Sequence, residues 1–108
     1  MTRGEVWWVQ FDPAIGSEIK KLRPAIIVSN NAANKHLSRV VVVPLTSNTS
    51  RLYPGEALVT IAGKKGKATA NQITTADKSR LKNQLGALSK EDMLKVEDAM
   101  LTHLGLPK

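Results

Sequence analysis

The sequence contains no cysteine, only two histidines and only four aromatic residues. Without cysteine, disulfides and thiolate metal sites are excluded, and a reducing cytoplasm is compatible with the composition. His36 and His103 alone argue against a histidine-based metal cluster, so we expect neither a metal nor a cofactor. No apolar run approaches the roughly 20 residues of a membrane helix, and the N-terminus lacks the apolar segment of a signal peptide. These absences predict a cytoplasmic protein that does not bind membranes.

Positive charge, by contrast, is abundant and unevenly spread. Residues 1–90 hold 14 Lys and Arg against five Asp and Glu, a balance of +9, whereas residues 91–108 hold two against four, a balance of −2. The length of 108 residues predicts a single domain, 1–108, with a core of its own. A basic body favours a polyanionic partner such as nucleic acid, although many small domains are basic for solubility alone.

The segment from residue 3 to residue 30 predicts a strand, a loop and a second strand. Residues 5–11 alternate in the period-2 pattern of a strand, and residues 24–29 form a short β-branched run that suits a buried strand. The loop between them carries a hydroxyl, a carboxylate and cations: Ser17, Glu18, Lys20, Lys21 and Arg23. Since Arg23 precedes a proline, its backbone is biased toward an extended conformation. The loop is therefore a candidate site between rigid strands.

A second candidate half-site follows the next apolar run. Residues 39–45, RVVVVPL, predict a strand buried on both faces, which should end, bulge or lie at an edge at Pro44. The run TSNTS at residues 46–50 follows directly. A cluster of short hydrogen-bonding side chains there is either an ordinary turn or half of a site.

The later segments predict short strands at residues 56–61, 68–74 and 85–88. The sequence GKKGK at residues 63–67 predicts a basic hairpin turn with solvated lysines, because it lacks the spacing and the Ser/Thr of a phosphate-binding P-loop. A short helix capped by Thr75 or Asp77 should extend to Lys82.

A final amphipathic helix begins after Ser89, which is an N-cap with Asp92 at the third helical position. Gly105 and a following proline end it. Its apolar stripe predicts packing against the core: Met93, Leu94, Val96, Met100, Leu101 and Leu104. Several short strands with one such helix predict a mainly β fold, a curved antiparallel sheet or partly open barrel.

Four separated segments resemble the MazF/PemK family of toxin endoribonucleases in their order and spacing: RGEVWWVQFDPAIGSE, RPAIIVSN, VVVVPLTSN and NQITTADKSRL. The resemblance covers nearly the whole chain. It implies a small SH3-like antiparallel barrel with a C-terminal amphipathic helix and a short helical insert. It also implies the toxin of a type II toxin–antitoxin system, a homodimer that cleaves single-stranded RNA (mRNA) sequence-specifically without metal and is neutralised by a cognate antitoxin.

By motif position, the resemblance assigns the family's usual catalytic pair to Arg23 and Thr46. Positions similar to those lining the RNA groove are Ser17, Glu18, Ser47, Asn48 and Gln72. Many relatives carry Gln-Gly-Gly where this chain has Ile19-Lys20-Lys21-Leu22, so the loop should be more basic, with Lys20 and Lys21 as RNA contacts. An arginine and an aspartate of some plasmid-encoded members fall near Thr69 and Asn71, so their acid–base role does not carry over.

The chemistry of these residues suits cleavage by the 2′-OH of the RNA itself. Arg23 can clamp phosphoryl oxygens with two parallel hydrogen bonds, and the Thr46 hydroxyl can donate to the same oxygens. The general base is open: arginine has a pKa above about 12, and Glu18 is the more conventional base. Gln72 either reads a base edge or pairs in the sheet. We assign Trp7 and Trp8 to packing and leave them, with Tyr53, outside the site.

Two other classes of function remain open on the sequence. One is a gyrase-poisoning toxin of the same fold, against which Arg23 and the Thr46 cluster argue. The other is a catalytically silent RNA-binding module, which would keep the positive charge but need no proton transfer.

Overall fold

The computed structural model describes residues 1–11 and 21–108. Within them the chain forms β1(Glu5–Gln10), β2(Leu22–Ile27), α1(Asn31–His36), β3(Arg39–Thr46), β4(Glu56–Ile61), β5(Lys64–Thr69), the 3₁₀ turn η1(Ala70–Gln72), β6(Thr74–Asp77), the 3₁₀ turn η2(Lys78–Arg80), β7(Leu81–Ala87) and α2(Lys90–Leu104).

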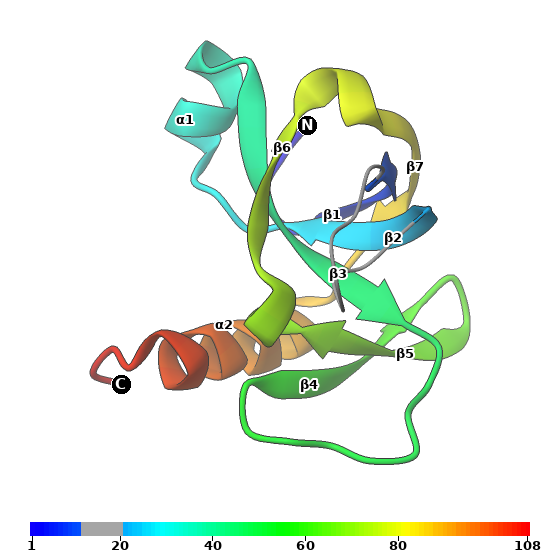
Figure 1. Ribbon diagram of the computed structural model, residues 1–108, viewed down its shortest axis with the longest axis vertical. Coiled ribbons are helices and arrows are strands. Elements are labelled where there is room, and N and C mark those ends of the chain that lie inside the picture. The colour runs from blue at the N-terminus through cyan, green and yellow to red at the C-terminus, as the bar shows by residue number, and fades with distance from the viewer. Residues whose placement is uncertain (12–20) are drawn as a thin grey trace.

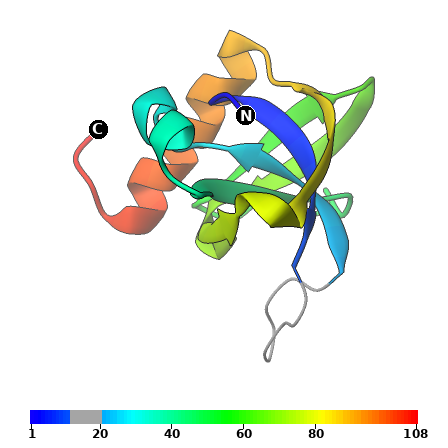
Figure 2. The ribbon, with the colours of Figure 1, turned by 90° about the horizontal axis from the view of Figure 1, so that it is seen from above.

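The strands form one curled antiparallel sheet in the order β4-β5-β3-β2-β1-β7, with β6 paired to β3. In Figure 1 the upper half contains β1, β2, β6, β7 and α1, and the lower half contains β4, β5 and α2, while β3 runs from one half into the other. From above, β1 and β7 curve together along one side of the sheet (Figure 2). The predicted mainly β fold, a small half-barrel with a C-terminal helix and a short helix, is confirmed.

β3 is the strand that joins the two halves, and it changes neighbours at Pro44. One edge of β3 pairs with β2 from Val42 to Pro44. The other edge pairs first with β6, as far as Val42, and then with β5 at Leu45 and Thr46. The strand thus continues through Pro44, whose missing N–H falls in the gap between β6 and β5. The Thr69 hydroxyl fills part of that gap by donating to the Pro44 carbonyl at 2.8 Å.

The core consists of two buried clusters on opposite faces of β2 and β3. Ile26 and Val43 belong to the cluster that packs against β4 and α2, together with Val96. Ile27 and Val42 belong to the cluster enclosed by β1, β2, β3, β6 and β7. Successive side chains of a strand point to opposite faces, and both strands are therefore buried on both faces, as their apolar runs predicted.

The β4–β5 hairpin differs from its prediction. Ile61 pairs directly with Lys64, so the turn is only Ala62-Gly63, and the lysines of GKKGK belong to β5. Both turn residues have positive φ, +51° and +77°, the conformation of a two-residue type I′ loop. The predicted turn over residues 63–67 is wrong. With three lysines the segment has the composition of a solvated turn, although it forms a strand whose inward positions are Gly66 and Ala68.

The segment after β5 also differs from its prediction. The strand ends at Thr69, and Gln72 lies in η1 rather than in a strand. The predicted helix up to Lys82 is a single 3₁₀ turn, Lys78–Arg80, whose N-cap Asp77 accepts from the Ser79 N–H at 2.9 Å. β7 accordingly begins at Leu81, four residues before the predicted strand. A pattern of period 2 with polar residues at most positions gave too weak a signal for this long edge strand.

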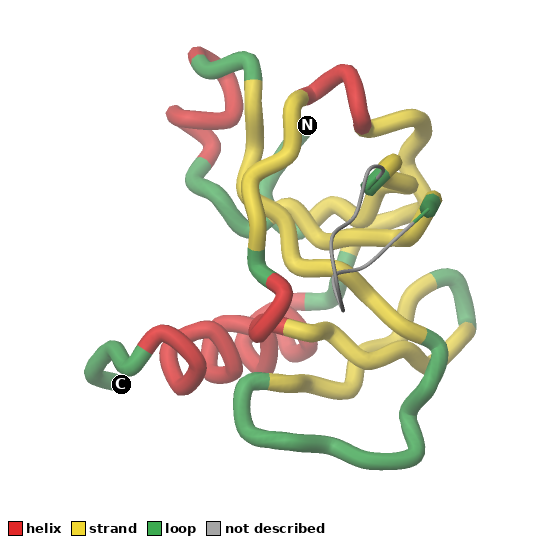
Figure 3. The backbone as a smooth tube through the Cα atoms, viewed as in Figure 1, coloured by secondary structure: helices red, strands yellow, loops and turns green. Residues whose placement is uncertain are grey.

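The C-terminal helix α2 begins and ends where its capping residues predicted. The Ser89 hydroxyl accepts from the Asp92 N–H at 3.1 Å, and Gly105 takes the left-handed conformation that ends the helix. Figure 3 shows α2 lying beside β4, and the helix also packs against η1. Two members of the predicted core stripe are wrong: Leu94 is 64% exposed and Leu104 is 50% exposed. The buried residues of α2 are Val96 and Ala99, so its contact with the core is centred on the middle of the helix, and Leu104 lies in the last turn.

Candidate active site at the end of the β2–β3 ladder

Arg23 and Thr46 meet at the place where β2 and β3 separate. The last pair of the β2–β3 ladder is Ala25 with Pro44. The same register continued by two residues places Arg23 opposite Thr46. Pro24 lacks an N–H, so this end of the ladder loses a backbone donor. Both Arg23 and Thr46 border the cavity that opens there.

That cavity, here called the apolar hollow, has a volume of about 360 Å³. Its walls are apolar side chains from five strands: Trp8 of β1, Leu22 and Pro24 of β2, Leu45 of β3, Ile61 of β4 and Leu85 of β7. Polar residues form its rim: Arg23, Thr46, Ser47, Lys64 and Lys65. The hollow is thus an opening into the core cluster that packs against α2, since Leu45 belongs to that cluster and Ile61 and Leu85 pack against it.

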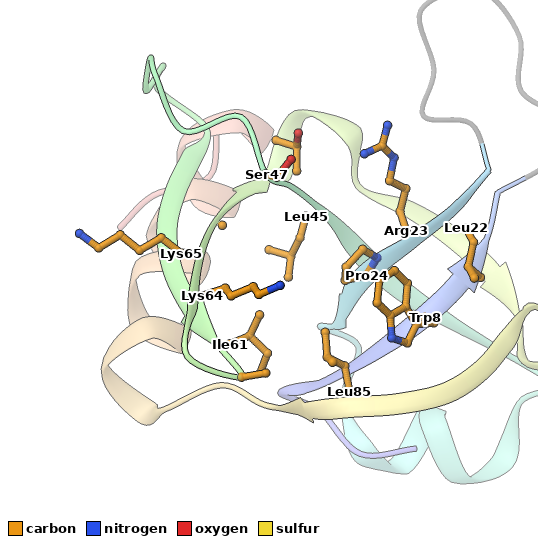
Figure 4. Close-up of a pocket in the computed structure, with 13 residues that line it drawn as sticks. Trp8, Leu22, Arg23, Pro24, Leu45, Ser47, Ile61, Lys64, Lys65 and Leu85 are labelled. Atoms are coloured by element: carbon orange, nitrogen blue, oxygen red, sulfur yellow. The ribbon is translucent and has the colours of Figure 1, made fainter.

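The cations of the rim are directed differently (Figure 4). The Arg23 guanidinium and the Ser47 side chain rise at the same rim of the hollow, above Pro24 and Leu45. The Lys64 ammonium points into the hollow, whereas the Lys65 side chain points away from it. Arg23 is exposed to solvent, so its planar fork is accessible to an anionic ligand at this rim.

Thr46 combines the two interpretations that the sequence left open for it. Its Oγ1 accepts from the Asn48 N–H at 3.4 Å, and Asn48 Oδ1 in turn accepts from the Ser50 N–H and hydroxyl at 3.2 and 2.7 Å. These bonds order the turn locally. Among the residues that the structure describes, Thr46 Oγ1 donates to no acceptor, and its hydrogen is available to a ligand.

A buried ion pair lies beside Thr46 and was missed by the sequence analysis. Lys67 is the cross-strand partner of Thr46, and directly opposite side chains share a face of the sheet. The Lys67 ammonium lies 3.3 Å from Glu56 Oε1 and donates to the Arg51 carbonyl at 2.9 Å. Glu56 Oε1 also accepts from the Tyr53 N–H at 2.9 Å. The two side chains, only 10% and 7% exposed, therefore fasten the loop that follows Thr46.

The structure brings only some of the predicted site residues to the hollow. Arg23, Thr46 and Ser47 lie at its rim, Lys21 is exposed one residue before β2, and Asn48 is in the turn after Thr46. Gln72 lies in η1, which packs against α2 and does not line the hollow. Ser17, Glu18 and Lys20 fall outside the described residues. Sequence reasoning missed Trp8 and Lys64, which only the register of β1 and β5 brings to the site.

Two carboxylates have lowered pKa values, and neither lines the hollow. Burial raises the pKa of Glu5, but hydrogen bonds outweigh it, from the Trp7 indole at 2.9 Å and the Thr2 N–H at 3.0 Å, so the pKa falls below its ordinary value. Hydrogen bonds from Ser79 lower the pKa of Asp77 in the same way. Both shifts belong to local caps of the fold.

Within residues 1–11 and 21–108, no three His, Asp or Glu side chains gather closely enough to hold a metal ion. In the same part of the chain, neither helix has the length and apolar character needed to cross a bilayer.

Comparison with known proteins identifies the family to which this small barrel belongs. Residues 2–104 match the family of PemK-like, MazF-like toxins of type II toxin–antitoxin systems. The chain therefore belongs to this toxin family.

Individual relatives match this chain over nearly their whole length. The chain is 39% identical to the endoribonuclease MazF9 of Mycobacterium tuberculosis, over 98% of each protein. A mycobacterial endoribonuclease solved in complex with its cognate antitoxin is 33% identical, with a TM-score of 0.84 over 100% of this chain and 98% of the other. MazF from Deinococcus radiodurans is 27% identical, with a TM-score of 0.87 over 98% and 97%.

Proposed function

We propose that this toxin is an endoribonuclease that cleaves single-stranded RNA (mRNA) at specific sequences without a metal. The observation that carries the proposal is the position of Arg23 and Thr46, opposite each other in register at one rim of the apolar hollow. The names of the MazF9 relative and of the mycobacterial structure, both endoribonucleases, support it.

The proposed reaction is attack by the 2′-oxygen on the adjacent phosphorus. A bond forms between the 2′-oxygen and phosphorus while the bond from phosphorus to the 5′-oxygen breaks. The 2′-OH loses its proton to a base, and the 5′-oxygen takes up a proton. The products are a 2′,3′-cyclic phosphate and a 5′-hydroxyl, and the protein must offset charge on the pentacovalent phosphate between them.

Arg23 and Thr46 supply the donors for that charge. The guanidinium holds two phosphoryl oxygens at once, and the Thr46 hydroxyl hydrogen donates to one of them. Ser47, at the same rim, adds a further donor. Because the turn after Thr46 is already ordered by its own hydrogen bonds, these donors need little rearrangement when charge develops.

The proton transfer is assigned to Glu18, a conventional general base, and the RNA groove to Ser17, Lys20, Lys21, Ser47, Asn48 and Gln72. These roles rest on the resemblance of the motifs. If a Glu18→Gln variant cleaves as fast as the parent, another group must be the general base.

The proposed assembly is a homodimer of single-domain chains, 1–108, acting in the cytoplasm. A cognate antitoxin would neutralise the toxin by placing an acidic segment on the basic groove; the mycobacterial structure with its antitoxin supports this kind of partner. Sedimentation that shows a fully active monomer at micromolar concentration would contradict the dimer. Simultaneous binding of antitoxin and RNA without mutual weakening would contradict the shared groove.

One experiment separates the proposal from its alternatives. Purified protein is incubated with a long single-stranded RNA in EDTA, and DNA gyrase is assayed in parallel. We expect cleavage in EDTA, no effect on gyrase, and resistance of a substrate with a 2′-deoxy sugar at the scissile position. Cleavage that requires magnesium or manganese would overturn the metal-free reaction. Binding without cleavage would identify an RNA-binding module, and gyrase inhibition alone would identify a gyrase poison.

A further inference from the structure

The apolar hollow is larger than phosphate chemistry requires, and its walls do not suit an anion. Six apolar side chains enclose about 360 Å³ beside Arg23 and Thr46. We propose that the hollow receives one unpaired nucleobase next to the cleaved phosphate, a uracil, guanine or cytosine that presents a carbonyl oxygen to Lys64. This inference rests on the proposed RNA cleavage and adds to it a residue-level basis for sequence preference.

Trp8 provides the flat surface on which such a base can stack. Trp8 pairs with Pro24 in the β1–β2 ladder, and the two rings lie side by side at the wall of the hollow. The neighbouring Trp7 packs against the other core cluster and donates to Glu5. Within the described part of the chain, the Trp8 indole N–H has no acceptor. A half-buried indole with a free donor is suited to base stacking, because every base has a π-face.

Lys64 provides the polar group that can distinguish one base from another. Its ammonium points into the hollow, between Leu45 and Ile61. An ammonium donates but cannot accept, so it pairs with the carbonyl oxygens of uracil, guanine and cytosine. Adenine has no exocyclic oxygen and offers an amino group instead. A cation at an otherwise apolar site therefore favours the carbonyl-bearing bases.

The hollow is continuous with the proposed catalytic pair. Trp8, Pro24 and the adjacent Leu45 form a row across β1, β2 and β3, and Arg23 and Thr46 are the next residues along β2 and β3. A strand advances about 3.3 Å per residue. Because successive side chains of a strand point to opposite faces, Arg23 and Thr46 project from the face opposite Pro24 and Leu45. A nucleotide whose phosphate is held at Arg23 can place a neighbouring base in the hollow by crossing the open end of the ladder, which both faces border.

The test uses single-turnover cleavage of DNA oligonucleotides with one ribonucleotide, in which each flanking base is varied in turn. At one flanking position the parent protein should prefer uracil, guanine and cytosine over adenine. Lys64→Met should remove this preference while cleavage itself remains. Lys65→Met is the matched control: it removes the same charge from the next residue, whose side chain points away, and should slow all substrates alike. Trp8→Ala should weaken binding about 10- to 100-fold, and Trp8→Phe should restore most of it.

The outcomes keep this inference apart from the proposed function. If the parent protein cleaves no RNA, the proposed function fails. If the parent cleaves and Lys64→Met retains the base preference, the hollow is not a base site while the endoribonuclease stands. A preference unchanged in all variants, together with loss of antitoxin binding in Trp8→Ala, would assign the hollow to the protein partner and overturn the inference. Circular dichroism establishes that each variant is folded, and Lys64→Met changes only an exposed residue.

Discussion

Arg23 and Thr46 lie opposite each other in register just beyond the last β2–β3 pair, where Pro24 removes a donor from the ladder. Pro24 immediately follows Arg23, and Pro44 is the last residue of β3 that pairs with β2. Since Pro24 cannot donate a backbone hydrogen bond to β3, the ladder ends at a defined point. The two side chains at that point belong to rigid strands, which favours precise positioning of donors.

Replacing Arg23 by lysine separates geometry from charge. Lysine keeps the positive charge, so long-range attraction for RNA should change little, but it loses the planar fork that holds two oxygens. We expect Arg23→Lys to slow single-turnover cleavage by a factor on the order of 10²–10³, as when a preorganised donor is removed. Arg23→Ala should be at least as slow and should bind RNA more weakly. Cleavage by Arg23→Lys within a few-fold of the parent would reduce Arg23 to an electrostatic anchor.

For the ion pair of Lys67 and Glu56, we predict an effect on the free energy of unfolding. Both side chains are almost fully buried, so Lys67→Met leaves the Glu56 carboxylate without its counter-charge. We expect a loss of about 3 kcal/mol in the free energy of unfolding, the usual scale for breaking one side of a buried pair. The double variant Lys67→Met/Glu56→Gln should recover most of it. Urea unfolding of the parent, Lys67→Met, Glu56→Gln and the double variant measures this coupling, and additive losses would show that the pair is not a unit.

The same residues show what sequence reasoning can reach at this scale. The positions of Arg23 and Thr46 at strand ends were predictable because each stands in a local pattern: an arginine before proline at a strand entrance, and a hydroxyl at a strand end. Lys67 and Trp8 were not, since the first was counted with a solvated turn and the second with the core. Both depend on cross-strand register, which local patterns do not specify.

At the scale of elements, the β4–β5 hairpin carries Lys64 to the hollow through a two-residue turn. Ala62 occupies that turn with a φ of +51°, although a Cβ makes this conformation unfavourable. Asn is the residue preferred there. Ala62→Asn should therefore raise the free energy of unfolding by about 1 kcal/mol. Gly63→Ala should lower it by a similar amount. Thermal unfolding measures both changes, and a destabilised Ala62→Asn would contradict the type I′ turn.

The elements that the sequence predicted well have strong signals at both ends. α2 has a capping serine, a left-handed glycine and a central apolar stripe, and its bounds agree with the prediction. β2 and β3 are continuous apolar runs, and both are buried as predicted. β5 and β7 lie toward the edges of the sheet and carry polar residues, so neither composition nor period 2 located their starts.

At the scale of the whole molecule, the lowered pKa values of Glu5 and Asp77 predict acid sensitivity. A carboxylate with a lowered folded pKa contributes stability that is complete above its unfolded pKa and is lost as the pH falls through the folded value. The ordinary values are 4.5 for Glu5 and 3.8 for Asp77. The free energy of unfolding should therefore decrease between about pH 5 and about pH 3.

Matched amide variants test the origin of that acid sensitivity. Glu5→Gln and Asp77→Asn keep the shape of each side chain and remove its titration. The urea midpoint of the double variant should depend less on pH below about pH 5 than that of the parent. An equal slope for both proteins would place the acid sensitivity in other carboxylates.

The change of neighbours along β3 makes the geometry of the proposed catalytic pair depend on local opening of the sheet. Arg23 is held by the half that contains β1 and β2, whereas Thr46 is paired with β5 in the other half. A local opening of β4, β5 and α2 would separate the two residues while the remaining strands stay paired. Amide hydrogen exchange at Leu45 and Thr46 should then report the fraction of molecules that are intact yet inactive. On warming, cleavage activity should decline together with hydrogen-exchange protection at these amides, before the half that contains β1, β2, β6 and β7 unfolds.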